Sequence, residues 1–132
     1  MTENGKKALY IASQCRNAGM TQAGAAGVLA NIEAESAFKS NNVQDCFESR
    51  VGGDAYYTAA VDSGAYPYFA TDGAGYGYCQ WTAPDRKEGM LRFHKGRGKS
   101  IGDGPTQVAW MIQEMRGYTK STTPADIVRS KA

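Results

Sequence analysis

The sequence predicts a mostly helical α+β domain, in which a small β-hairpin lobe stands beside a helical body with a cleft between them. Apolar residues recur at helical spacing in several stretches of the chain. Between these stretches, Gly73–Trp81 combines glycines with aromatic residues, and Asp72-Gly73 is a hairpin-type turn signal. The chain has 132 residues, 42% of them hydrophobic, which fits a single domain over residues 1–132.

Two helices are predicted in the first third of the chain, over residues 6–18 and 22–36. Gly19 is a natural C-terminal cap for the first helix, and Thr21 can cap the second. The apolar stripe of the second helix consists of Ala25, Val28, Leu29 and Ile32.

The remaining helices are shorter. Asp54 can cap a helix over 55–63, Thr82 one that runs to about 95, and Pro105 opens one to about 116. A last short helix is predicted from 122 onward. Because the chain stops inside this helical pattern, we expect either a domain cut from a longer protein or a domain with a short finish.

Composition excludes several classes of function. A net charge of +2 without a basic run argues against nucleic acid binding, and no apolar stretch approaches the ~20 residues of a membrane span. Three cysteines, Cys15, Cys46 and Cys79, cannot all pair within the chain, which fits reduced synthesis in the cytosol. With one histidine and no C-x-x-C spacing, neither a metal site nor a cofactor is expected.

Two carboxylates, Glu33 and Glu35, stand near the end of the second helix in V-L-A-N-I-E-A-E-S-A-F, residues 28–38. Helical spacing places both near the apolar arc and slightly favours Glu35. Partial burial raises the pKa of a carboxylic acid and makes it a proton donor near neutral pH. The alternative is an exposed glutamate that makes a local helix contact.

A second candidate segment is G-Y-G-Y-C-Q-W, residues 75–81. Its glycines allow close backbone approach, the Gln80 amide can donate to and accept from sugar hydroxyls, and aromatic faces can stack on pyranose rings. The alternative is a core strand with a tight turn. The residues predicted to hold a glycan are Tyr76, Tyr78, Gln80 and Trp81.

Together, N-I-E-A-E-S-A-F and G-Y-G-Y-C-Q-W-T resemble the lysozyme-like superfamily, and above all the phage tail lysozyme family of endolysins and tail proteins. Goose-type lysozymes and lytic transglycosylases are related. The similarity runs from about residue 8 to 115 and includes D-S-G-A-Y, D-G-A-G-Y-G and R-K-E-G-M-L. It implies a lysozyme-like fold and cleavage of the β-1,4 bond between N-acetylmuramic acid and N-acetylglucosamine in peptidoglycan.

The resemblance also implies roles for single residues. Glu35, directly before Ser36, matches the general acid. Gln80 matches a glutamine that lines the saccharide cleft, and Tyr76 an aromatic residue near the acid. Tyr78 stands where the family usually has an aliphatic residue.

The mechanism stays open between two chemistries. A hydrolysing muramidase needs a second carboxylate. Asp72 is the choice over Asp62 and Asp45, because it lies beside the glycine-rich segment, where it would act electrostatically or position water. A lytic transglycosylase needs no second carboxylate, since the 6-hydroxyl of the sugar attacks.

Two rival functions remain. A cysteine peptidase would use Cys79 and His94, which must then be in contact. A non-catalytic module would bind the wall or build a phage tail. The first residues lack an apolar stretch adequate for a signal peptide, so we expect synthesis in the bacterial cytoplasm. Delivery to the wall would then depend on a holin, a phage tail or a secretion apparatus.

Overall fold

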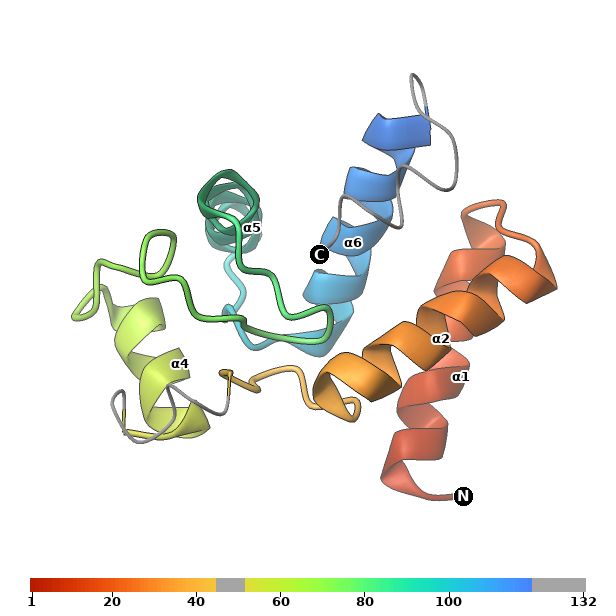
Figure 1. Ribbon diagram of the computed structural model, residues 1–132, viewed down its shortest axis with the longest axis horizontal. Helices are drawn as coiled ribbons and strands as arrows, with labels where there is room; N and C mark the ends of the chain where they lie inside the picture. Colours follow the sequence, from red (N-terminus) through yellow and green to blue (C-terminus); the bar gives the residue numbers. More distant parts are fainter. Residues whose placement is uncertain (45–51, 120–132) are drawn as a thin grey trace.

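The computed structural model describes residues 1–44 and 52–119, and within them it is mostly helical, as predicted (Figure 1). Cys46, Asp45 and the helix predicted from 122 lie outside the described residues. None of the described helices is long and apolar enough to cross a lipid bilayer. The helices are α1 (Glu3–Asn17), α2 (Gln22–Ser36), α4 (Asp54–Ser63), α5 (Pro84–Gly96) and α6 (Gly104–Thr119).

Short-range capping explains some of the helix ends, but α4, for which Asp54 was the predicted cap, and α5 have no side-chain cap. The hydroxyl of Thr21 accepts a hydrogen bond from the Gly24 amide at 3.0 Å, as predicted, and Gly64 ends α4 with φ +83°. The predicted cap at Thr82 is wrong. Helix α5 begins at Pro84 with Ala83 at the cap position, because a proline in the first turn has no amide that needs a partner.

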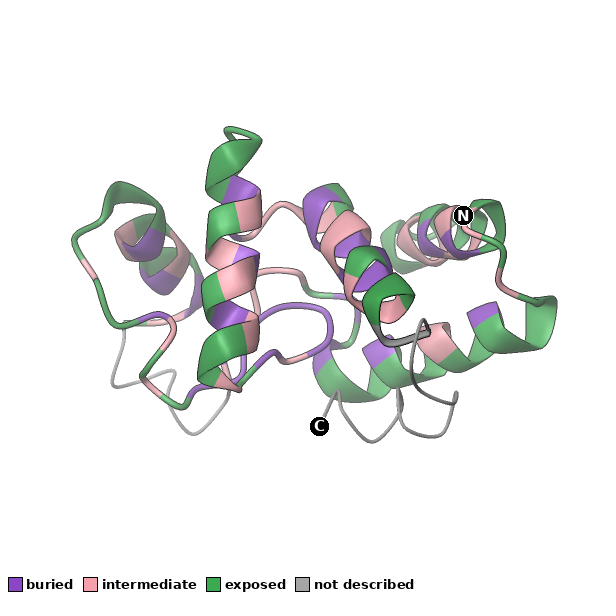
Figure 2. Ribbon diagram, turned by 90° about the horizontal axis from the view of Figure 1, so that it is seen from above, coloured by how far each residue is buried: buried purple, intermediate pink, exposed green. Residues whose placement is uncertain are grey.

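The helices form one body around the glycine-rich segment. Helix α1 packs against α2 and α6, and α5 packs against α6, whereas α4 lies at the opposite end of the molecule (Figure 1). Residues 74–79 are all buried and form the purple loop at the centre of Figure 2. The segment expected to wall a cleft is therefore the middle of the core.

The predicted β-hairpin lobe is not found among the described residues. Tyr76 makes two isolated antiparallel bridges, one with Val43 and one with Trp81. The Tyr76 amide donates to the Trp81 carbonyl at 3.1 Å, and the Trp81 amide donates to the Tyr76 carbonyl at 3.0 Å. The turn between them contains Gly77 and Gln80 at φ +82° and +50°, left-handed values that a tight reversal of the chain requires.

Candidate active site

The end of α2 is joined to the glycine-rich segment through Ser36. The Ser36 side chain is buried, and its hydroxyl lies 3.0 Å from the carbonyl oxygen of Ile32 and 2.9 Å from that of Tyr78. Ala37 and Phe38 follow at φ +51° and +61°, left-handed values that non-glycine residues rarely adopt. Strained backbone held in place by long-range contacts is a common feature of functional sites.

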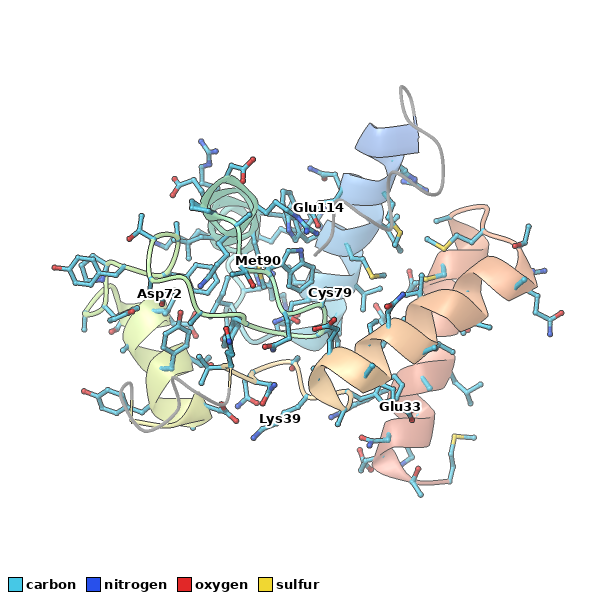
Figure 3. All side chains as sticks on the ribbon, viewed as in Figure 1. Glu33, Lys39, Asp72, Cys79, Met90 and Glu114 are labelled. Carbon is cyan, nitrogen blue, oxygen red and sulfur yellow. The ribbon has the colours of Figure 1, made fainter. Side chains whose placement is uncertain are left out.

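Glu33 and Glu35 both have exposed side chains. The expectation that helical spacing shelters them is wrong, because the buried stripe of α2 is narrow and consists of Ala25, Ile32 and Ser36. Glu35 therefore lies at the surface, one residue before the buried serine that contacts the glycine-rich segment. In Figure 3, α2 ends near the tip of the loop that carries Cys79.

The glycine-rich segment is paired along one side with residues 42–44. The Gly77 amide donates to the Asn42 carbonyl at 2.9 Å, and the Gln44 amide donates to the Gly75 carbonyl at 2.7 Å. The Gly75 amide donates to Oε1 of Gln44 at 3.0 Å. This pairing was not predicted from the sequence, where the local signal for it is a single apolar residue, Val43, in a polar stretch.

The Gln80 amide is used inside the protein. Its Nε2 donates to the carbonyl oxygens of Asn42 at 2.9 Å and Gly77 at 3.0 Å. Both N–H donors are thus satisfied, and they fix the tight turn to the neighbouring segment. The expectation that this amide donates to sugar hydroxyls is therefore not met.

The three aromatic residues expected to hold glycan are core residues instead. Tyr76 and Trp81 are 0% exposed and Tyr78 is 5% exposed. Nε1 of Trp81 donates to Glu114 at 2.8 Å, and burial raises the pKa of Tyr76 above its ordinary range. A ring with no exposed face cannot stack on a sugar, so the core interpretation of this segment is the one that the structure supports.

Asp72 is an anchor within the protein. Its carboxylate accepts hydrogen bonds from the hydroxyls of Tyr57 and Tyr66 at 2.6 and 2.8 Å, from the Ala74 amide at 3.0 Å and from Nζ of Lys87 at 2.8 Å. Burial alone would raise the pKa of Asp72, but the bonds from Lys87 and Tyr57 outweigh it and lower the pKa.

With four donors on two oxygens, the Asp72 carboxylate is poorly suited to hold a catalytic water. It also lies beside α4, at one end of the molecule, whereas α2 ends nearer the middle (Figure 3). The alternative candidate Asp62 is engaged as well, because it accepts from the Ser100 hydroxyl at 2.5 Å and the Ile101 amide at 2.8 Å. The carboxylates of Asp72 and Asp62 therefore both stabilise loops through hydrogen bonds.

The described residues contain no Cys/His pair arranged for peptidase chemistry. Nδ1 of His94 is bonded to the Ser100 carbonyl at 2.8 Å, and its buried Nε2 has no hydrogen-bond partner. Neither nitrogen is therefore hydrogen-bonded to the Cys79 thiol. Within the same part of the chain, no three His, Cys, Asp or Glu side chains are grouped so that they could bind a metal ion.

The sequence comparison decides the family. The sequence model for phage tail lysozyme matches residues 6–131, nearly the whole chain. The chain belongs to the phage tail lysozyme family. No curated protein and no solved structure matches it.

Membership of the phage tail lysozyme family confirms the resemblance drawn from the two motifs. It supports a peptidoglycan-lysing activity of the lysozyme type, with peptidoglycan as the substrate.

One further residue of the site was not singled out by the sequence. Gln107 of α6 is fully buried and accepts a hydrogen bond from the amide of Tyr78 at 3.0 Å.

Proposed function

We propose that this phage tail lysozyme cleaves the β-1,4 bond between N-acetylmuramic acid and N-acetylglucosamine, with Glu35 as the general acid. The observation that carries the proposal is the 2.9 Å contact between the Ser36 hydroxyl and the Tyr78 carbonyl. It sets the last turn of α2, and with it Glu35, beside the glycine-rich segment. Glycoside cleavage needs an acid placed to protonate the leaving oxygen.

The exposure of Glu35 is compatible with this substrate. A peptidoglycan strand is a polymer that must lie along a surface, so its acid has to be reachable from solvent before binding. A bound glycan would then displace water from the carboxyl group. Glu33 is exposed too, but it lies three residues before Ser36 and is not adjacent to the joint, the contact between Ser36 and Tyr78. It therefore serves as a matched control.

Hydrolysis and lytic transglycosylation both remain candidate reactions. Hydrolysis by a muramidase is the first candidate, since the family is one of lysozymes. Transglycosylation is the second, because the carboxylate expected to assist water, Asp72, is bonded to Lys87 and two tyrosines. A reaction in which one glutamate acts first as acid and then as base needs no such partner.

Mass spectrometry of digested peptidoglycan tests the proposal and separates the two reactions. Reducing muramic acid ends indicate hydrolysis, and anhydro-muramic ends indicate transglycosylation. Glu35→Gln should abolish either product, whereas Glu33→Gln should retain the parent rate. General acid catalysis contributes roughly 10²- to 10⁴-fold, so the difference between the two variants should be large.

Two outcomes would reject the assignment. Glu35→Gln protein that cleaves as well as the parent would show that another group is the acid. Intact glycan after digestion with the parent, combined with retained binding to sedimented walls, would favour a non-catalytic wall-binding or tail module.

We further propose that the protein reaches the wall on a phage tail, after holin release or through a secretion apparatus, alone or with other domains of a longer phage protein.

A further inference from the structure

Gln107 makes hydrogen bonds to three separate segments of the chain. It lies in the first turn of α6 and has no exposed surface. Its Oε1 accepts from the Tyr78 amide at 3.0 Å, and its Nε2 donates to the carbonyl oxygens of Ser40 at 2.7 Å and Ile101 at 2.8 Å. All hydrogen atoms of this amide are used, and none of its partners is another side chain.

The Gln107 amide also lies directly on the backbone of the glycine-rich segment. A Cβ atom at Gly77 would lie 2.8 Å from Oε1 of Gln107 and 2.9 Å from its Nε2. Real Cβ atoms do not approach polar atoms so closely, so a glycine at 77 is required for this contact. The close approach explains why the amide can reach both Tyr78 and the Ser40 carbonyl.

Tyr78 is consequently held from two helices at once. Its amide donates to Gln107 of α6, and its carbonyl accepts from Ser36 of α2. The side-chain amide of Gln107 also donates to the Ser40 carbonyl, which belongs to the segment that follows α2. Gln107 therefore fixes the exit of α2 and the glycine-rich segment against each other, and Glu35 lies on the helix that ends at this joint.

We propose that Gln107 is the positioning residue for Glu35, an inference that rests on the proposed glycan cleavage. Gln107 does not touch the glycan. It sets the place of the acid by fixing the last turn of α2 relative to residues 77 and 78. Misplacing a reacting group by about 1 Å can cost roughly 100-fold in rate, so even a small shift of the last turn of α2 would lower turnover.

Three substitutions at Gln107 distinguish the effects of its individual hydrogen bonds. Gln107→Met fills similar volume and removes all three bonds. Gln107→Glu keeps an acceptor for the Tyr78 amide but offers at most one proton to the two carbonyl oxygens. Gln107→Asn keeps the amide one methylene shorter and carries the test if the methionine variant does not fold. Gln113→Met is the matched control, because Gln113 is exposed on the same helix.

The experiment measures kcat and KM on soluble glycan strands with each full-length variant, at a temperature where its circular dichroism shows a folded protein. We expect kcat to fall about 10- to 100-fold for Gln107→Met and Gln107→Glu, while KM stays within about threefold. Gln113→Met should match the parent. Amide hydrogen exchange by NMR should be roughly tenfold faster at Tyr78 in Gln107→Met but not in Gln107→Glu.

The proposal is overturned if the folded Gln107 variants keep kcat within about twofold of the parent, or if their loss lies in KM alone. Unprotected exchange of the Tyr78 amide in the parent protein would overturn it without any variant. The proposed function fails differently: Glu35→Gln would then retain activity, which removes the basis of both proposals. Loss of activity in Glu35→Gln combined with active Gln107 variants rejects the positioning role alone.

Discussion

Nζ of Lys87 lies 2.8 Å from Oδ1 of Asp72, and the Lys87 side chain has no exposed surface. The same Nζ donates to the Ala74 carbonyl at 2.7 Å and lies 4.3 Å from the centre of the Phe69 ring. This pair ties α5 to the turn where the glycine-rich segment begins. A buried ion pair is costly to form but also costly to break, because a lone charge left inside has no compensation.

Lys87→Met should therefore destabilise the protein by about 3–5 kcal/mol, since it leaves the Asp72 carboxylate buried without its cation. Urea unfolding followed by circular dichroism measures the change. The matched control is Arg92→Met: Arg92 is exposed on the same helix and lies 4.0 Å from Glu88, so its loss should cost at most about 0.5 kcal/mol. Equal effects of the two substitutions would contradict the anchoring role of the Lys87–Asp72 pair.

Stability should fall on mild acidification because of His94. Burial lowers the pKa of this histidine, against a weaker opposing effect of its bond to the Ser100 carbonyl. The unfolded chain takes up a proton near pH 6.5, whereas the folded protein does so only at lower pH, so the unfolded state binds more protons in between. The stability that neutral His94 contributes is present above pH 6.5 and is lost as the pH falls through the pKa of His94 in the folded protein.

The free energy of unfolding should therefore decrease as the pH falls below about 6.5, by up to ~1.4 kcal/mol per pH unit. Unfolding in urea at several pH values measures the slope. Because His94 is the one histidine of the chain, His94→Gln should flatten it. The lowered pKa of Asp72 acts separately, since the stability it contributes is lost only below its ordinary value of 3.8. A parent curve that is flat from pH 5 to 8 would refute the assignment.

The sequence predicted the helices and their positions along the chain because these depend on local signals. Each of these signals lies within a few residues of its helix: Thr21 caps the start of α2, Glu35-Ser36 ends α2, and Gly64 ends α4. The family could be recognised for a related reason: its two motifs are short and contiguous. The hydrogen bond from Ser36 to the Tyr78 carbonyl, which joins the two motifs in the structure, was not predicted.

The inner or outer location of the aromatic residues was not predictable in the same way. A glycine-rich run with tyrosines and tryptophan has the same composition in a cleft wall and in a core. The difference is decided by partners far along the chain, such as Glu114 for Trp81 and Lys87 for Asp72. The Gln107 bonds to Ser40 and Tyr78 span 67 and 29 residues, and no local pattern marks them.

Ser36→Ala tests the joint between α2 and the glycine-rich segment. The substitution leaves the buried Tyr78 carbonyl without its donor at 2.9 Å, which should cost about 1–2 kcal/mol of stability. The helix end should also shift, and we expect about a tenfold lower kcat on soluble glycan strands. Ser13→Ala on the exposed face of α1 is the control and should change neither quantity. Parent-like turnover by folded Ser36→Ala protein would show that the joint does not place the acid.

Trp81→Phe distinguishes a core tryptophan from one that stacks on glycan. The Trp81 ring has no exposed surface, and its Nε1 donates to the Glu114 carboxylate, which also pairs with Arg86 at 2.9 Å. Phenylalanine keeps most of the apolar contact but removes this donor, so we expect a loss of about 1–3 kcal/mol in urea unfolding. KM for soluble glycan strands should stay within about twofold of the parent, because no face of the ring meets the substrate. A rise in KM without loss of stability would return Trp81 to the glycan-binding surface.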